Sequence, residues 1–260
     1  MHDNRPIGIY DSGIGGLSVL NELKKQLPDE SVVYFGDTLH LPYGDKSQEE
    51  ILVYNTHIFS ILIENNCKMI ISACNTSSSL ALDTMTEIYP YMPTIGLIRP
   101  GSLSALNTTK NKKIGVIATS ATVLSNSYKN TIEQLSSSVE VQQVACPAFV
   151  PLIESGKLNS PEMMAAVKRY TAQFHDIDTL IYGCTHYPVL EPILKTIPKL
   201  ESVSFVDPAV ATVARAKSEL AKLKLTADSH HNPEYSFLWS GHTPGLFDEK
   251  EYQTAEVVEV

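Results

Sequence analysis

Met69-Ile70-Ile71-Ser72-Ala73-Cys74-Asn75-Thr76 is the stretch that decides the fold, because Thr179-Leu180-Ile181-Tyr182-Gly183-Cys184-Thr185-His186 matches its pattern 110 residues later. Each stretch is an apolar run, typical of a buried strand, that ends in a cysteine and polar residues. A second similarity, between residues 7–12 and 114–119, recurs in the same order at an offset of 107 residues. Two such features at nearly one offset indicate two similar halves.

Outside these stretches, short apolar runs alternate with amphipathic segments. From Leu17 to Leu27, leucines spaced three or four residues apart mark one face of a helix, and Pro28 ends it. Strands separated by helices predict parallel βαβ units with helices on both faces of each sheet. We therefore predict the α/β class, with two pseudo-symmetric doubly wound domains, mainly parallel sheets, and an active-site cleft between the domains.

The same pattern gives approximate element bounds. The expected strands are residues 6–10, 31–35, 68–72, 94–98, 113–117, 139–144, 179–182, 201–206 and 235–240. The expected helices are residues 17–27, 48–65, 78–89, a segment after 122, 147–155, 161–174, 189–196 and a long helix that opens at 207–208. We assign residues 1–97 and a returning segment, 208–260, to the first domain and residues 98–207 to the second.

Composition and charge exclude several classes of protein. The chain has 260 residues, of which 43% are hydrophobic, which suits one or two globular domains. Its 20 Lys and Arg against 29 Asp and Glu give a net charge of −9, which argues against nucleic acid or an anionic membrane surface as a partner. No apolar run approaches the roughly 18 residues of a membrane span, and residues 1–6 lack the apolar stretch of a signal peptide. We expect a cytoplasmic protein.

The four cysteines divide into two kinds. They are too few and too scattered for a disulfide framework or a zinc site, and no CxxC pair exists, so we expect no metal. Cys67 and Cys146 are expected to be packing residues, as buried free cysteines usually are. Cys74 and Cys184 each end a strand and precede a helix, where the positive helix terminus lowers a thiol pKa. Because ligands of such sheets bind beyond the carboxyl ends of the strands, both should face one cleft.

Two thiols on opposite sides of a cleft suit the inversion of a stereocentre. One group, a thiolate, removes the α-proton from one face, and the other, a thiol, delivers a proton to the opposite face. A free thiol has a pKa of about 8.5 and needs help to ionise; His186 beside Cys184 and Asp11 near the first site are the available assistants. A disulfide-exchange pair would instead need the sulfurs within bonding distance.

The glycine-rich segment Asp11–Gly16 allows a different interpretation. Glycines in a strand–turn–helix element supply positive φ and close packing. Dinucleotide binding would need G-x-G-x-x-G, but Ser18 stands at the third glycine, although Asp37 occupies the place of the ribose-binding acid. A P-loop is excluded because no Gly-Lys-Ser/Thr follows. A nucleotide-binding oxidoreductase module, tested by titration with NAD(H), stays a rival hypothesis.

Motifs in one order between Gly8 and Pro188 resemble those of bacterial glutamate racemases. They are Asp11-Ser12-Gly13-Ile14-Gly15-Gly16-Leu17, Gly36-Asp37-Thr38 followed by Pro42-Tyr43-Gly44, Ala73-Cys74-Asn75-Thr76, Ala145-Cys146-Pro147 with Glu154-Ser155-Gly156, and Gly183-Cys184-Thr185-His186-Tyr187-Pro188. The resemblance implies a cofactor-independent amino-acid racemase that makes D-glutamate for peptidoglycan. No lysine lies inside these motifs, which argues against a pyridoxal Schiff base.

The resemblance also implies roles for individual residues. Cys184 would take the proton from L-glutamate and Cys74 from D-glutamate, and Asp11, Glu154 and His186 would tune or assist the thiols. The implied substrate site comprises Asp11, Ser12, Tyr43, Gly44, Asn75, Thr76, Thr119, Thr122, Thr185 and His186. Hydroxyls, amides and helix N-termini of this kind hold carboxylates without a large positive charge.

The partners follow from the same resemblance. It implies L- and D-glutamate as the small-molecule substrates and a homodimer as the assembly. Some members of the family have an N-terminal extension and are activated by a cell-wall precursor. Because this sequence starts directly at its first expected strand, we expect no such activation of this protein. A racemase for aspartate and a paralogue that mainly binds another protein stay open as alternatives.

Overall fold

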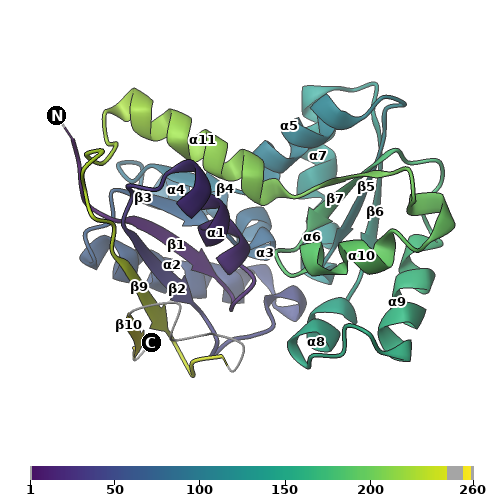
Figure 1. The fold of residues 1–260 in the computed structure, drawn as a ribbon, viewed down its shortest axis with the longest axis horizontal. Coiled ribbons are helices and arrows are strands. Elements are labelled where there is room, and N and C mark those ends of the chain that lie inside the picture. Colours follow the sequence, from purple (N-terminus) through teal and green to yellow (C-terminus); the bar gives the residue numbers. More distant parts are fainter. Residues whose placement is uncertain (1, 245–253, 259–260) are drawn as a thin grey trace.

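The computed structural model describes residues 2–244 and 254–258, which form two parallel sheets, each covered by helices (Figure 1). The first sheet has the order β10-β9-β2-β1-β3-β4, with bounds Thr254–Val257, Tyr235–Trp239, Val32–Gly36, Ile7–Asp11, Met69–Ser72 and Thr94–Gly96. The second has the order β6-β5-β7-β8, with bounds Glu140–Ala145, Lys113–Ala118, Thr179–Gly183 and Ser204–Val206. Every described strand pairing is parallel, which confirms the predicted α/β class.

The two sheets share one internal order, as the sequence repeat predicts. The order β2-β1-β3-β4 of the first sheet corresponds to β6-β5-β7-β8 of the second. The first sheet has two more strands than the second. β9 pairs with the edge of β2, with Val32 opposite Tyr235, and β10 pairs with β9. The expected strand at 235–240 is therefore confirmed, while β10 carries no signal that we recognised.

Register brings the carboxyl ends of the central strands together. In the first sheet Tyr10 lies opposite Ser72, so Asp11, the last residue of β1, and Cys74, just after β3, lie at neighbouring strand ends. In the second sheet Ala118 lies opposite Gly183, so Thr119 and Cys184 do the same. Strands β1, β3 and β7 are buried at every position, which explains why they read as unbroken apolar runs.

The helices connect and cover the sheets. Their bounds are α1 Leu17–Gln26, η1 Tyr43–Asp45, α2 Gln48–Glu64, α3 Asn75–Leu80, α4 Leu82–Ile88, α5 Ile98–Thr108, α6 Ser120–Leu124, α7 Ser127–Leu135, α8 Phe149–Glu154, α9 Pro161–Thr171, η2 Tyr187–Leu190, α10 Glu191–Leu194, η3 Pro198–Leu200 and α11 Pro208–Leu223. Sequence signals fix several starts: Ser47 and Glu50 form a capping box at α2, and Asp207 caps α11 before Pro208.

Some expected bounds were wrong. The strand expected at 94–98 ends at Gly96, because the chain turns into α5 at Ile98. Pro100 lies in the first turn of α5, where its missing N–H costs nothing. The single helix expected at 78–89 is two helices that meet at Ala81, and the strand expected at 201–206 shortens to β8 because η3 precedes it.

The first sheet has a core on each face. One core joins β-strand residues to α1 and α11 through side chains such as Leu20, Leu23, Val213 and Leu220. The other packs α2 against the opposite face around Phe59. Figure 1 shows α11 running back from the second sheet to lie along the first. Across residues 2–244 and 254–258, no helix has both the length and the apolar character that crossing a membrane requires.

Candidate active site

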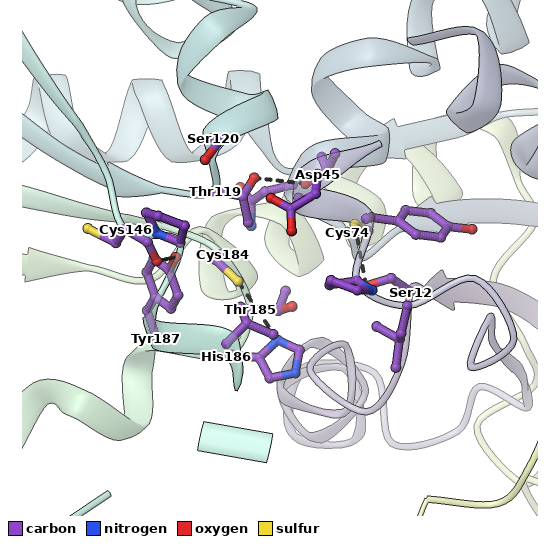
Figure 2. A pocket seen from close by; sticks show the side chains of 18 of the residues that line it. Ser12, Asp45, Cys74, Thr119, Ser120, Cys146, Cys184, Thr185, His186 and Tyr187 are labelled. Atoms are coloured by element: carbon purple, nitrogen blue, oxygen red, sulfur yellow. Dashed lines mark hydrogen bonds between the residues drawn. The ribbon is translucent and has the colours of Figure 1, made fainter. Parts of the chain in front are cut away.

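A small cavity of about 40 Å³ lies where the carboxyl ends of the two sheets meet (Figure 2). Both Cys74, from the end of β3, and Cys184, from the end of β7, line it. Of the other sequence-predicted site residues, the lining includes Asp11, Ser12, Tyr43, Gly44, Asn75, Thr76, Thr119, Thr185 and His186. The sequence repeat therefore places its two cysteines on opposite sides of one cavity.

The first thiol is buried and lies near a carboxylate. Cys74 is the N-cap residue of α3 and is 5% exposed, and its Sγ lies 4.0 Å from Oγ of Ser12. Burial raises the pKa of Cys74 to about 12, and the nearby charge of Asp11 adds to this shift. The shift is opposite to the one expected from the helix start, and Asp11 opposes the ionisation of Cys74 instead of assisting it.

The second thiol lies beside a charged imidazole. Cys184 Sγ is 3.8 Å from Nδ1 of His186, and Nε2 of His186 is 2.6 Å from Oε1 of Glu154. Burial alone would lower the pKa of His186, but its hydrogen bonds to Cys184 and Glu154 outweigh burial and hold that pKa well above its usual value. The two thiols therefore have different surroundings, one with a carboxylate and one with an imidazolium.

Two buried polar atoms at the cavity have no hydrogen-bond partner among the described residues. Oδ2 of Asp11 accepts from the backbone N–H groups of Gly13 (3.2 Å) and Gly16 (3.0 Å), which leaves Oδ1 unpaired. Oδ1 of Asn75 accepts from the hydroxyl of Tyr128 at 2.7 Å, which leaves Nδ2 unpaired. Buried polar groups are normally paired, so an unpaired acceptor and an unpaired donor in one cavity indicate a ligand with both polarities.

Threonine hydroxyls join the two halves beside the cavity. Oγ1 of Thr76 lies 3.0 Å from Oγ1 of Thr119, which lies 3.0 Å from Oγ1 of Thr122. Thr122 is fully buried and stands behind the lining, and Glu154 likewise reaches the cavity only through His186. The structure thus places these two predicted site residues one layer away from the space that a ligand would occupy.

Glycines of the segment after β1 allow close approach between the halves. A Cβ on Gly15 would lie 2.5 Å from Oγ1 of Thr185 and 2.6 Å from Nδ1 of His186. None of Gly13, Gly15 and Gly16 has a positive φ, so our expectation of left-handed backbone here was wrong. The need for glycine at position 15 is steric, because this loop of the first half touches Thr185 and His186 of the second.

Sequence reasoning missed part of the lining. The missed residues are Leu41, Pro42, Asp45, Ser120, Cys146, Pro147, Val150, Pro151 and Tyr187. Several are direct neighbours of predicted residues, and that adjacency was a usable signal. Cys146 packs in the core, as expected, and its thiol donates to the carbonyl oxygen of Val144 at 3.5 Å, yet it also forms part of the cavity wall.

Comparison with known proteins agrees with this geometry. The Asp/Glu/Hydantoin racemase profile matches residues 13–216. Glutamate racemase of Nostoc sp. PCC 7120 is 47% identical over 223 residues, covering 85% of this chain and 75% of its own length. The crystal structure of glutamate racemase isoform RacE1 from Bacillus anthracis superposes with a TM-score of 0.92 at 34% identity, covering 100% of this chain and 99% of its own. That of Francisella tularensis glutamate racemase in complex with D-glutamate gives 0.91 at 37% identity, covering 99% and 98%. The chain belongs to the Asp/Glu/hydantoin racemase family, and it is a racemase of the isomerase class.

Proposed function

We propose that this protein is a glutamate racemase that interconverts L- and D-glutamate by proton transfer between Cα and two cysteines, without a cofactor. The observation that carries the proposal is the placement of Cys74 and Cys184 at equivalent strand ends on opposite sides of one cavity. Inversion at Cα needs a base on one face and an acid on the other, and two opposed thiols supply both.

The proton steps follow from the different surroundings of the thiols. Cys184, as the thiolate beside the His186 imidazolium, takes the α-proton of L-glutamate. The buried Cys74 thiol then gives its proton to the opposite face of Cα, which yields D-glutamate, a Cys184 thiol and a Cys74 thiolate. The reverse direction exchanges the two roles, so atoms and charge balance in both.

The unpaired polar atoms suit the ammonium and carboxylate groups that every α-amino acid carries on Cα. Oδ1 of Asp11 accepts from the α-ammonium group, and Nδ2 of Asn75 donates to a carboxylate. Neutral donors such as Ser12, Thr76 and Thr185 hold the remaining carboxylate oxygens. The relatives named above act on or bind glutamate, which supports that side chain over the shorter one of aspartate.

Isotope exchange in D₂O tests the proposal directly. After dialysis against a chelator, the protein should invert glutamate while deuterium enters the α position, as followed by circular dichroism and ¹H NMR. Racemisation that begins only when pyridoxal phosphate or a metal is added would contradict the mechanism. A clearly higher kcat/KM for aspartate than for glutamate would contradict the substrate.

Single-cysteine variants test the two roles. Cys74→Ser and Cys184→Ser should each lower racemisation by roughly 100- to 10,000-fold, because a serine hydroxyl is a far poorer base. Cys184→Ser should still exchange the α-proton of D-glutamate, and Cys74→Ser that of L-glutamate. Cys67→Ser is the matched control, since Cys67 is buried away from the cavity, and it should retain racemisation.

The wider role comes from the family. We propose that the D-glutamate serves peptidoglycan synthesis in the cytoplasm, which complementation of a D-glutamate auxotroph tests.

We also propose that the protein is a homodimer, which light scattering tests. We further propose two domains, one of residues 1–97 with 208–260 and one of residues 98–207, which limited proteolysis tests.

A further inference from the structure

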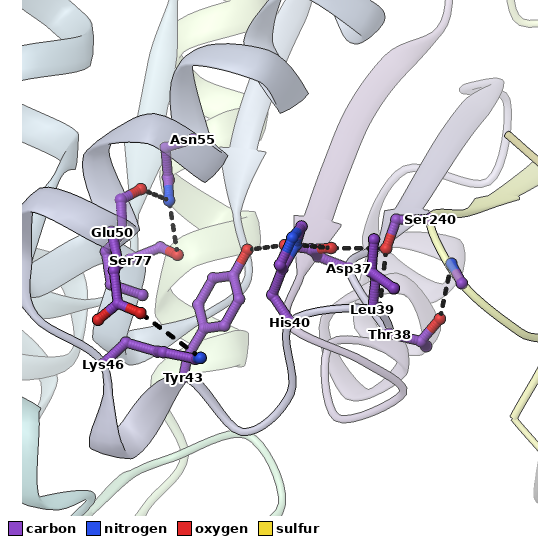
Figure 3. Close-up of polar contacts among 12 residues, drawn as sticks. Asp37, Thr38, Leu39, His40, Tyr43, Lys46, Glu50, Asn55, Ser77 and Ser240 are labelled. Carbon is purple, nitrogen blue, oxygen red and sulfur yellow. Dashed lines mark hydrogen bonds and ion pairs between the residues drawn. The ribbon is translucent and has the colours of Figure 1, made fainter. Parts of the chain in front are cut away.

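The loop between β2 and α2 carries part of the cavity wall and is held from outside the cavity. It spans residues 37–47 and contributes Tyr43 and Gly44 to the lining. Its conformation is not set by regular secondary structure apart from the short η1. Polar contacts with two other parts of the first half set it instead (Figure 3).

Asp37 is the centre of these contacts. Its side chain is 1% exposed, and its carboxylate accepts from the hydroxyl of Tyr43, from Oγ of Ser240 at 2.5 Å, and from Nδ1 of His40 at 2.8 Å. Both carboxylate oxygens are thus committed to protein donors. This arrangement leaves no acceptor for a ribose hydroxyl, the role that the rival nucleotide-binding interpretation gave to Asp37.

The segment after β9 fastens the start of the same loop. Oγ of Ser240 accepts from the backbone N–H of Leu39 at 3.0 Å while it donates to Asp37. Thr38 donates to the carbonyl oxygen of His242 at 2.9 Å and accepts from the backbone N–H groups of Gly241 (3.2 Å) and His242 (3.1 Å). Residues 240–242 therefore act as a clamp on residues 37–39.

Tyr43 links this clamp to the first thiol. Its hydroxyl is occupied by Asp37, so its ring, not its hydroxyl, serves the cavity. The ring packs in one apolar cluster with Ile51, Cys74 and Ala81, and Tyr43 is 2% exposed. The position of the ring therefore decides how well Cys74 is shielded from water.

We infer that Asp37 is a positioning residue for Tyr43, and that Ser240 and Thr38 anchor their loop to the segment that follows β9. The inference rests on the proposed function for its kinetic consequence, but its physical claim concerns only the packing around Cys74. The hydroxyl of Ser240, which follows β9 and does not line the cavity, thus controls the shielding of Cys74.

Alkylation of the native cysteines tests the physical claim without any turnover. Ser240→Ala removes both contacts of the hydroxyl, and Thr38→Val is a second, nearly isosteric variant for the same clamp. Peptide mass spectrometry after limited iodoacetamide treatment should show Cys74 reacting about tenfold faster in both variants, the effect of losing one to two buried hydrogen bonds. Cys67 and Cys184 are internal references, and Ser236→Ala, on the preceding strand β9, is the matched control.

An unchanged alkylation rate at Cys74 would overturn the inference. An equal rise in the rates at Cys67 and Cys184 would also overturn it, because that pattern means that the whole protein has become less tightly packed. If the wild type fails to racemise glutamate, the proposed function falls, while the alkylation result still decides the positioning role.

Kinetics then tests whether Ser240 acts through Tyr43. In a double-mutant cycle of Ser240→Ala with Tyr43→Phe, the losses in kcat/KM should be clearly less than additive, since both variants break one chain through Asp37. The cycle of Ser236→Ala with Tyr43→Phe should be additive. Additive losses in the first cycle would contradict the chain.

Discussion

Tyr128 donates a 2.7 Å hydrogen bond to Oδ1 of Asn75, and this contact sets the orientation of the amide that directly follows Cys74. Tyr128 lies on α7 of the second half, while Asn75 opens α3 of the first. Because Oδ1 is engaged by the tyrosine, the donor face of the amide is turned away from it and stays unpaired. A residue of one half thus orients a cavity-lining amide of the other, the amide that we propose binds a carboxylate.

The variant Tyr128→Phe should therefore weaken substrate binding more than chemistry. Without the hydroxyl, the amide of Asn75 is free to rotate, and we expect KM for both enantiomers to rise about five- to tenfold, the effect of one buried hydrogen bond. Steady-state kinetics in both directions measures this. Tyr182→Phe is a suitable control, since its hydroxyl contacts Glu191 and Tyr182 does not line the cavity. Equal KM values for the two variants would refute the role of Tyr128.

The ion pair between Glu154 and His186 should be visible in the pH profile. The hydrogen bonds to Cys184 and Glu154 keep the pKa of His186 high, so Glu154→Gln should lower it. If the imidazolium is required, activity falls as pH rises through that pKa, and the basic limb of kcat/KM should move to lower pH. At neutral pH the loss should be about fivefold or less, because Glu154 is partly exposed. A shift of the acidic limb alone would contradict this assignment.

The contact between Gly15 and His186 should make even a methyl group harmful. In Gly15→Ala the new Cβ would overlap Oγ1 of Thr185 and Nδ1 of His186, and the halves would have to separate. Displacing a catalytic group by about 1 Å costs on the order of 100-fold in rate. Gly13→Ala is the matched control in the same loop, because its Cβ meets only the flexible side chain of Leu41, at 3.1 Å. Comparable kcat values for the two variants would show that the close approach is not needed.

A buried ion pair at the other end of the first sheet should affect stability alone. Nζ of Lys68 lies 2.5 Å from Oε2 of Glu30, and both side chains are almost fully buried. Lys68→Met would leave an uncompensated buried carboxylate and should lower the free energy of unfolding by about 3–5 kcal/mol. Urea denaturation measures this loss, and adding Glu30→Gln should recover part of it. Since Lys68 precedes β3 and Cys74 follows it, kcat of the folded variant should be unchanged.

The local parts of the fold and site were predictable from sequence. The apolar runs that end in Cys74 and Cys184 predicted β3 and β7. The repeat of this pattern predicted that the two sheets share one strand order. The polar residues next to each cysteine then fell into the cavity, because the carboxyl ends of neighbouring parallel strands meet at one edge.

Contacts between distant segments were not predictable. Nothing in the sequence near Asp37 indicates that Ser240 donates to it, and nothing near Asn75 indicates Tyr128. The first pair depends on β9 adding to the edge of β2, and the second on how the two halves pack together, and periodicity reports neither. The pairing of β10 with β9 was missed for a local reason, because its short run has no turn signal beside it on which a strand assignment could rest.

The placement of β9 beside β2 also constrains the order in which a growing chain can fold. Val32 and Tyr235 pair in register although they lie far apart in the sequence. All strands of the second sheet lie between Lys113 and Val206, so a ribosome releases them before β9 is made. Domains fold as units when their residues have emerged. The second sheet can therefore be complete before β9 exists, and β2 keeps an open edge until residues 235–239 have been made.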